Sequence, residues 1–180
     1  MNHVIRAVRS DEWAKVKDIR LASLQDPAAP VAFLETYEGA LAQPDAFWQE
    51  RAARAGQFIA EAPDGTWSGT VTLLIEEAGD MDFLGATSER AQGHLVGVFV
   101  RPEQRGTGLL GALVDAALDW AWSLEEPWLA RVRLHVHEGN PRAQAAYRKL
   151  GFVPTGTSLA LDGYPSAAPG RELELAVNRP

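Results

Sequence analysis

The sequence predicts an α/β fold of the α+β type, built on a single mixed sheet of about seven strands. Strand-like and helix-like segments alternate in the order βααβββαβαββ, which is typical of a layered structure that mixes the two kinds of element. The chain of 180 residues is long enough to bury a substantial core. No internal repeat or linker-like composition interrupts it, so residues 1–180 are predicted to form one domain.

The first half of the chain is predicted to contain a strand, two helices and a hairpin. Gly56 marks a helix end, and the turn sequence Pro63-Asp64-Gly65 marks the hairpin. Residues 26–44 hold three prolines and are expected to form a loop, with a short helix at 33–41. The predicted elements are a strand at 4–8, helices at 11–24 and 45–55, and strands at 57–61 and 66–76.

The second half continues with strands and two further helices. Residues 77–93 are polar and contain glycine, so we expect a mobile loop there. The helix at 108–124 is predicted from apolar residues spaced three and four apart, namely Leu110, Leu113, Val114, Ala117, Ala121 and Leu124. The other predicted elements are strands at 94–100, 131–137, 152–161 and 172–178, and a helix at 141–150.

The most informative segment is the turn between the strand at 94–100 and the helix at 108–124. It reads Arg-Pro-Glu-Gln-Arg-Gly-Thr-Gly over residues 101–108. Gly106 and Gly108 allow positive φ and a close approach of a ligand to the backbone. Backbone N–H groups and the partial positive charge of the helix N-terminus then converge on one point. The turn therefore predicts a binding site for the phosphate or pyrophosphate of a small molecule.

The same residues also fit the dinucleotide-binding pattern G-x-G-x-x-G, through Gly106, Gly108 and Gly111. Glu138 follows the next predicted strand, roughly where an acid that binds ribose is expected. Against this interpretation, five residues separate the strand from the first glycine. About a hundred residues also precede a motif that usually lies in the first βαβ unit. A nucleotide-dependent oxidoreductase stays open as an alternative.

Composition excludes several classes of chemistry and partner. A net charge of −7 argues against nonspecific binding to nucleic acid. Cysteine is absent, which excludes disulfides, thiolate metal sites and a cysteinyl intermediate, so any acyl transfer is expected to proceed by direct attack in a ternary complex. No signal peptide is visible, and no stretch reaches the ~18 apolar residues of a membrane span. We expect a cytoplasmic protein without membrane contact.

A second informative segment follows the strand at 131–137. Asn140 is predicted to cap a helix that has Pro141 at its first position and Gly151 just beyond its end. Within this helix Ala143 and Tyr147 lie on one apolar stripe, four residues apart. Tyr147 is therefore expected to point inward, towards the sheet.

Together, the two segments resemble the GNAT superfamily of acyl-CoA N-acyltransferases. The first reads Val-Phe-Val-Arg-Pro at 98–102 with Arg-Gly-Thr-Gly at 105–108, and the second is Asn140-x-x-Ala143-x-x-x-Tyr147-x-x-x-Gly151-Phe152. The resemblance covers residues 94–156. It implies a mostly antiparallel central sheet with helices on both faces, and an N-acetyltransferase that uses acetyl-CoA. A homodimer is also expected, because dimers are common in the family.

The resemblance assigns cofactor-binding residues to both segments. Backbone N–H groups of Val98, Phe99 and Val100 are expected to hold the pantetheine arm and polarise the thioester carbonyl. Asn140 is expected to contact the pantetheine. The pyrophosphate is assigned to the turn and the start of the helix, at Gln104, Arg105, Gly106, Thr107, Gly108, Leu109 and Leu110. Glu103 departs from the family pattern, which often has Gln or Arg there, although backbone contacts do not depend on that side chain.

Acyl transfer to an amine needs an unprotonated nitrogen and a proton for the departing thiolate. We hypothesise that Tyr147 is the general acid; the alternative is a core tyrosine whose hydroxyl bonds to the backbone. His94 is the hypothesised general base, acting directly or through water, on a strand face that it is expected to share with Val96 and Val98. Rival bases are Glu35, Glu38 and Glu76, and a solvent relay without a single base is the remaining alternative.

The acceptor is expected to be the amine of a small molecule or a peptide. The mixed charges of residues 26–50 and 77–93 select no particular acceptor. His135 and His137 share one face of a strand, but no third ligand lies near them in sequence, so no metal is predicted. A non-catalytic domain that binds or senses acyl-CoA stays open as a second alternative.

Overall fold

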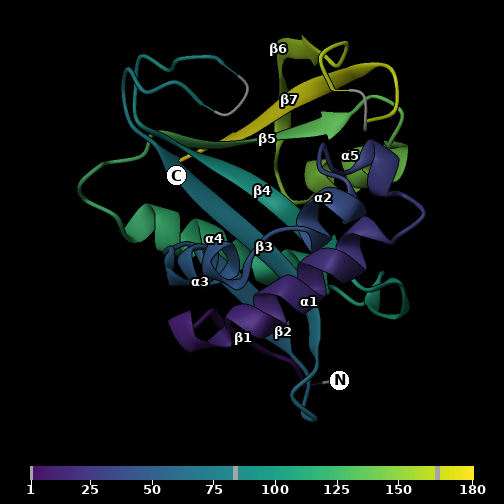
Figure 1. Ribbon diagram of the computed structural model, residues 1–180. Coiled ribbons are helices and arrows are strands. Elements are labelled where there is room, and N and C mark those ends of the chain that lie inside the picture. Colours follow the sequence, from purple (N-terminus) through teal and green to yellow (C-terminus); the bar gives the residue numbers. More distant parts are fainter. Residues whose placement is uncertain (1, 83–84, 165–166) are drawn as a thin grey trace.

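The computed structural model describes residues 2–82, 85–164 and 167–180, and its strands form one seven-stranded sheet (Figure 1). The strands lie in the order β1-β2-β3-β4-β5-β7-β6. Their bounds are Val4–Ala7 for β1, Gln57–Glu61 for β2, Trp67–Glu76 for β3, Gln92–Val100 for β4, Arg131–His137 for β5, Val153–Ala160 for β6 and Arg171–Asn178 for β7. Each predicted strand is present, and its ends fall within two residues of the predicted ones.

Every pair of neighbouring strands is antiparallel except β4 with β5, which is parallel. The sheet is therefore mixed and mostly antiparallel, as expected. A dinucleotide-binding fold places its glycine-rich turn in a series of parallel βαβ units. The glycine pattern at 106, 108 and 111 does not lie in such a series, so the dinucleotide interpretation is wrong.

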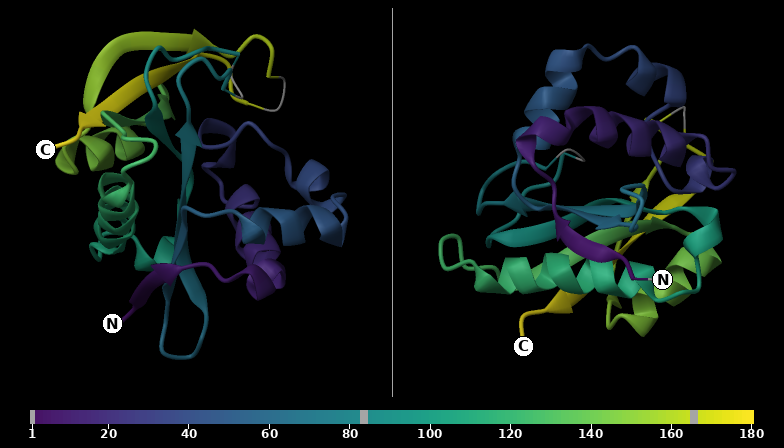
Figure 2. Two further views of the ribbon diagram at one scale, coloured as in Figure 1. Left: turned by 90° about the vertical axis from the view of Figure 1, so that its left-hand side faces the viewer. Right: turned by 90° about the horizontal axis from the view of Figure 1, so that it is seen from below.

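Helices cover both faces of the sheet (Figure 2). On one face lie α1 (Trp13–Leu24), α2 (Tyr37–Leu41) and α3 (Asp45–Ala53), and on the other α4 (Leu109–Ser123) and α5 (Pro141–Lys149). Short 3-10 turns occur at Ser10–Glu12, Ala29–Val31 and Pro102–Gln104. Among the described residues, every helix is too short or too polar to cross a membrane.

Each face of the sheet has its own apolar core, and β2 shows how alternation sorts the residues. Phe58 and Ala60 belong to the core beneath α4, while Ile59 between them belongs to the core beneath α1 and α3. The fully buried Leu113 of α4 and Trp48 of α3 lie in these two cores respectively. A ligand that contacts both helical layers would therefore have to pass through an opening in the sheet.

The connection between α1 and α2 differs from prediction. The helix expected at 33–41 begins only at Tyr37, because the Thr36 hydroxyl accepts a hydrogen bond from the Gly39 N–H at 3.0 Å and caps the helix there. Phe33 and Glu35 consequently remain in the connection, where their side chains are free to face a cavity.

The segment expected to be a mobile loop at 77–93 is attached to the sheet. Asp82 forms an ion pair with Arg133 of β5, and Met81 forms a β-bridge with Thr87. β4 already begins at Gln92. Residues 83–84 of the predicted loop lie outside the described residues. At Asp82 the segment is connected to the sheet, because its carboxylate pairs with a buried guanidinium; mobility of the loop stays a prediction.

Candidate active site

β4 and β5 separate after only three paired residues. Their parallel register runs from Gly93 with Val132 to Leu95 with Leu134, and each strand then continues without the other. Figure 1 shows β4 running towards α1 while β5 stays beside β7. Backbone N–H and C=O groups on the free edge of β4 therefore face an opening in the sheet.

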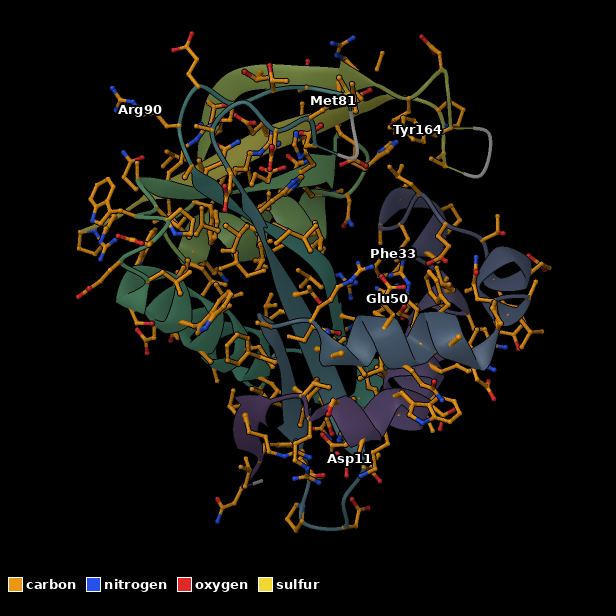
Figure 3. The ribbon with its side chains drawn as sticks, turned by 60° about the vertical axis from the view of Figure 1, so that its left-hand side comes forward. Asp11, Phe33, Glu50, Met81, Arg90 and Tyr164 are labelled. Atoms are coloured by element: carbon orange, nitrogen blue, oxygen red, sulfur yellow. The ribbon has the colours of Figure 1, made fainter. Side chains whose placement is uncertain are left out.

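A cavity of about 1050 Å³ occupies this opening. Its lining includes Arg20 and Arg51 from one helical layer and Leu110 and Tyr147 from the other, so it reaches both faces of the sheet. The connection between α1 and α2 and the connection between β6 and β7 also contribute, through Phe33 and Tyr164 among others (Figure 3). The cavity is large enough for a drug-sized or cofactor-sized ligand together with a small acceptor.

β4 carries a β-bulge beside the cavity. Thr70 of β3 pairs with Phe99 and Thr72 with Val96, so three steps along β4 match two along β3. Gly97 adopts a φ of +59°, which only glycine takes without strain. The bulge reverses the alternation of side chains. Leu95 and Val98 consequently both pack against the core beneath α4.

The bulge corrects one expectation about His94. His94 alternates with Leu95 and points to the opposite face, so it does not share a face with Val98 as simple alternation predicts. Val98, Phe99 and Val100 all line the cavity, as does His94 itself. The expected pantetheine-binding backbone and the hypothesised base therefore reach one cavity from different sides of the strand.

The glycine turn that follows β4 has the geometry of an anion site. Gly106 and Gly108 adopt φ values of +78° and +87°, and Gly108 is the N-cap of α4. Within the described chain, the N–H groups of Gly106, Thr107 and Gly108 meet no acceptor. A Cβ added at either glycine would meet no atom within 4 Å, so the concave side of the turn is open. The turn fits a pyrophosphate.

The side chain of Arg105 connects this turn to β4 and to the segment after α1. Its Nε donates to the Val100 carbonyl at 3.0 Å, and its Nη2 donates to Oδ2 of Asp26 at 2.5 Å. Burial of Asp26 opposes its charge, but hydrogen bonds from the Ala28 N–H and from Arg105 hold the pKa of the carboxyl below its ordinary value. The guanidinium therefore fixes the turn against the end of α1, and the turn's anion donors are its backbone N–H groups.

α5 brings two of the predicted residues to the cavity. Asn140 caps the helix as expected, since its Oδ1 accepts a hydrogen bond from the Ala143 N–H at 3.2 Å. Tyr147 points inward and is 8% exposed, with its ring edge-on to Phe152. Burial, together with the nearby Glu172, raises the pKa of Tyr147 above its ordinary value. At neutral pH the Tyr147 hydroxyl is therefore protonated and able to donate.

His94 is buried between two partners. Its Nδ1 lies 3.2 Å from Oε2 of Glu76, and its Nε2 lies 3.0 Å from Nδ1 of His135. Burial opposes the charge of Glu76, but hydrogen bonds from His94 and Arg133 lower the pKa of the carboxyl to about 2. An ionised Glu76 only accepts, so Nδ1 of His94 carries a proton. In neutral His94, Nε2 then accepts from His135.

This arrangement leaves Nε2 of His135 without a proton. Burial, with further contributions from the neighbouring His94 and Arg133, lowers the pKa of His135 to about 4. His135 lines the cavity with His94. A neutral imidazole with an unprotonated nitrogen therefore lies between the cavity and the buried His94–Glu76 pair.

Arg133 holds the carboxylates beneath these histidines. It donates to both oxygens of Glu76 at 3.0 and 2.9 Å and to Glu174 at 2.9 Å, and it also pairs with Asp82. Glu76, Asp82 and His94 lie close enough together to suggest a cation site. Because the Arg133 guanidinium already fills the position of a cation there, this cluster is an ion-pair network rather than a metal site.

His135 uses one ring nitrogen on a protein partner, whereas His137 uses both. In His137, Nδ1 accepts from the Gly139 N–H at 2.8 Å, so Nε2 carries the proton and donates to the Ala168 carbonyl at 3.1 Å. His137 is thus a neutral structural histidine at the cavity wall. His135 and His137 therefore do not form a metal-chelating pair, although they lie on one face of β5.

The rival bases lie in three different settings. Glu35 lines the cavity but forms an ion pair with Arg20 at 2.8 Å. Glu38 is exposed on α2 and lies outside the cavity lining. Glu76 lies beneath His94, whose ring it contacts. Of the three, only Glu35 belongs to the cavity lining.

Sequence reasoning missed several cavity residues, and two of them are charged groups that bear on the chemistry. Arg51 of α3 and Glu172 of β7 both line the cavity. Burial raises the pKa of Glu172 to about 7, although His137 partly opposes this rise. For Glu172 a signal existed, because it alternates with Leu173 of the core and so must face the other side of the strand. For Arg51 no local pattern distinguishes it from a solvated arginine.

Comparisons with known proteins agree with this geometry. The model of the acetyltransferase (GNAT) family matches residues 18–152, which is three quarters of the chain. A mycothiol acetyltransferase of Segniliparus rotundus is 39% identical over 93 residues, covering 50% of this chain and 32% of the relative. A spermidine N(1)-acetyltransferase of Vibrio cholerae is 34% identical over 59 residues, covering 33% of each chain. The aligned part spans only about a third of the length of either relative.

Solved structures show the same fold. Arabidopsis thaliana NAA60 in complex with acetyl-CoA superposes with a TM-score of 0.72 at 16% identity, covering 98% of both chains. An acetyltransferase of the GNAT family from Streptococcus pneumoniae superposes with a TM-score of 0.68 at 18% identity, covering 99% of this chain and 100% of the other. The family model matches residues 18–152, and the structure has the bulged β4 and the separation of β4 from β5 described above. The chain therefore belongs to the GNAT acetyltransferase family.

Proposed function

We propose that this protein transfers an acetyl group from acetyl-CoA to the primary amine of a small molecule or peptide, by direct attack of the amine. The observation that carries the proposal is the opening between β4 and β5, which joins an anion-binding turn to a cavity that reaches both faces of the sheet. Membership of the GNAT family supports the same reaction. A homodimer and a cytoplasmic location stay predictions from the sequence.

The cofactor is proposed to lie between the glycine turn and β4. Backbone N–H groups at residues 106–110 hold its pyrophosphate, with the N-terminus of α4 adding a favourable dipole. The expected N–H donors at Gln104 and Arg105 already donate to the carbonyls of Arg101 and Pro102. The free edge of β4 at residues 98–100 and the amide of Asn140 hold its pantetheine arm. When bound, acetyl-CoA supplies an activated acetyl group and a thiolate leaving group.

Tyr147 is proposed to hold the proton that the leaving thiolate needs. Its ring is buried in the cavity wall, and burial raises the pKa of its hydroxyl. A phenol that remains protonated at neutral pH can act as a general acid towards a thiolate, whose ordinary pKa is about 8.5. The backbone N–H groups near the bulge at Gly97 are proposed to stabilise the carbonyl oxygen as it gains charge.

His94 is proposed to receive the proton of the attacking amine, through His135. Nε2 of His135 can take up a proton from the cavity while its Nδ1 gives its own proton to Nε2 of His94. Ionised Glu76 then faces the protonated His94 at 3.2 Å and stabilises its charge. The histidine pair thus moves a proton from the cavity into a buried ion-pair network.

The proposal is tested by two measurements on the purified chain. Calorimetric titration with acetyl-CoA is expected to give saturable binding. A panel of amines is then expected to include acceptors that release CoA thiol, and background is low because the chain has no cysteine. Binding of acetyl-CoA without transfer to any amine would indicate a non-catalytic acyl-CoA-binding domain, and absence of binding would reject both.

A further inference from the structure

We propose that the acceptor amine carries an anionic group, a carboxylate or a phosphate, which Arg51 binds on the α1–α3 side of the cavity. This inference rests on the proposed function, since it names the class of molecule that receives the acetyl group. The cavity positions an unused guanidinium where the acceptor, rather than the cofactor, is expected to lie.

Arg51 is a half-buried cation without an anionic partner. It lies in the last turn of α3 and lines the cavity. In the described part of the chain, no carboxylate lies within 4.0 Å of its guanidinium, and the guanidinium donates no hydrogen bond. Its Cζ atom lies 5.7 Å from the centroid of the Trp48 ring. Because the side chain is only half-buried and lines the cavity, its guanidinium is accessible to an anionic ligand there.

The residues around Arg51 increase the positive character of this wall. Arg20 and Arg54 also line the cavity, and each is paired with one carboxylate, Glu35 at 2.8 Å and Glu50 at 3.3 Å. Arg51 therefore contributes a positive charge that these acids do not balance. Burial and the neighbouring Arg20 lower the pKa of Arg51 to about 10, so it is still charged at neutral pH.

The position of Arg51 separates this wall from the cofactor phosphates. The glycine turn opens α4 on one face of the sheet, whereas Arg20 and Arg51 belong to the helices on the other face. A small cavity of about 20 Å³ is lined by Arg51 together with Thr72 and Gly97, so Arg51 lies beside the β4 bulge. An anion bound by Arg51 is consequently close to the expected acetyl group and hence close to the attacking amine.

The charge pattern discriminates between classes of acceptor. A planar guanidinium offers two parallel N–H donors that match a carboxylate or a phosphate. A polyamine places a second cation in the same cavity, where Arg51 and its neighbours repel it. Small amines with a nearby carboxylate or phosphate are therefore expected to be better acceptors than the same amines without the anion.

Matched pairs of acceptors test the inference directly. Glycine is compared with glycinamide, L-phenylalanine with its amide, phosphoethanolamine with ethanolamine, and spermidine serves as the polycation. Initial rates of CoA thiol release give kcat/KM for each acceptor. Within at least one pair we expect a preference of about 10- to 100-fold for the anionic member, and which pairs show it distinguishes a carboxylate from a phosphate.

Variants of the arginine provide the second arm. Arg51→Gln is expected to abolish the preference by lowering kcat/KM for the anionic member to about that of the neutral member, and Arg51→Lys is expected to retain part of the preference. Arg148→Gln removes one charge from an exposed position on α5 outside the cavity and is the matched control. Equal rates for both members of every pair, or a preference that survives in Arg51→Gln, would overturn the inference.

A binding measurement separates failure of this inference from failure of the proposed function. N-acetylglycine and N-acetylglycinamide are titrated into the protein in the presence of CoA, which requires no catalysis. One outcome is that N-acetylglycine binds more tightly than N-acetylglycinamide, that Arg51→Gln removes this difference, and that no amine is acetylated. This outcome rejects the transferase activity but supports the anion site. Transfer to neutral amines with no such dependence supports the transferase and rejects the anion site. Neither binding preference nor transfer rejects both.

Discussion

Nε2 of His94 lies 3.0 Å from Nδ1 of His135, and this hydrogen bond joins β4 to β5 at the last few residues before the strands separate. A single proton occupies the bond, so the protonation states of the two rings are coupled. Glu76 anchors the buried end of the pair, and the other end faces the cavity. If the pair transfers the proton of the amine as proposed, we expect the two rings to act as a unit.

Replacing either histidine with glutamine is expected to impair amine deprotonation. His94→Gln and His135→Gln should each lower kcat by about 100-fold, because general-base catalysis contributes on this order. The double variant should be little worse than either single one, since the residues act as a unit. The dissociation constant of acetyl-CoA should not change. His3→Gln, at a histidine bonded to Ser68, is the control, and additive losses would argue against a relay.

Replacing Tyr147 with phenylalanine is expected to lower turnover by about 100-fold with little change in acetyl-CoA affinity. The hydroxyl is the only group removed, and its raised pKa keeps it protonated over the working range of pH. Acetyl thioesters whose leaving thiol has a lower pKa need less help from a general acid. With such donors the ratio of wild-type to Tyr147→Phe turnover should become smaller. Tyr37→Phe on α2 is the control, and unchanged turnover in Tyr147→Phe would reject the general acid.

The helices and strands were predictable because their signals are local. The Asn140 cap, for example, depends on the Ala143 N–H three residues away. The bulge on β4 was not predicted, although a glycine inside a strand is a recognised sign of one. Whether Gly97 forms a bulge depends on the register with Thr70 and Thr72 of β3, which no spacing within β4 reveals. Because that register was unknown, the expectation that His94 and Val98 share one face of the strand was wrong.

The ion-pair network was beyond sequence reasoning for the same reason. Arg133 meets Glu76, Asp82 and Glu174 at separations of 57, 51 and 41 residues. No helical or strand period links such positions. The cofactor turn, by contrast, lies in one continuous segment, and its positive φ values at Gly106 and Gly108 follow from the sequence.

Replacing Gly108 with alanine is expected to weaken acetyl-CoA binding at least tenfold, because the donors of the turn lose their alignment. The φ of +87° also costs an alanine about 1 kcal/mol of folding stability. Gly65→Ala is the matched control: Gly65 has a φ of +84°, lies in the hairpin between β2 and β3, and has nothing within 4 Å of an added Cβ. Equal loss of affinity in both variants would contradict a specific role for the turn.

Replacing Arg133 with methionine is expected to destabilise the fold by about 3–5 kcal/mol, since it leaves buried carboxylates without their cation. Chemical denaturation at pH 7 measures the loss. It should diminish in acid as the carboxylates become protonated, because the native network keeps the pKa of Glu76 at about 2. Arg90→Met, on the exposed loop before β4 (Figure 3), is the control and should change stability by less than about 0.5 kcal/mol.

Glu172→Gln is expected to stabilise the protein at high pH only. Burial raises the pKa of Glu172 from 4.5 to about 7 in the native state, so the neutral form is favoured there. The stabilisation from this group is fully present below pH 4.5 and is lost as the pH rises through about 7. Glutamine is neutral throughout and escapes that loss.

The Tm of Glu172→Gln should therefore exceed that of the wild type at pH 8.5 and approach it at pH 4.5. Glu38→Gln, at an exposed position on α2, is the control and should show no such difference between the two pH values. A Tm difference of the same size at both pH values would show that the substitution acts through packing and not through ionisation.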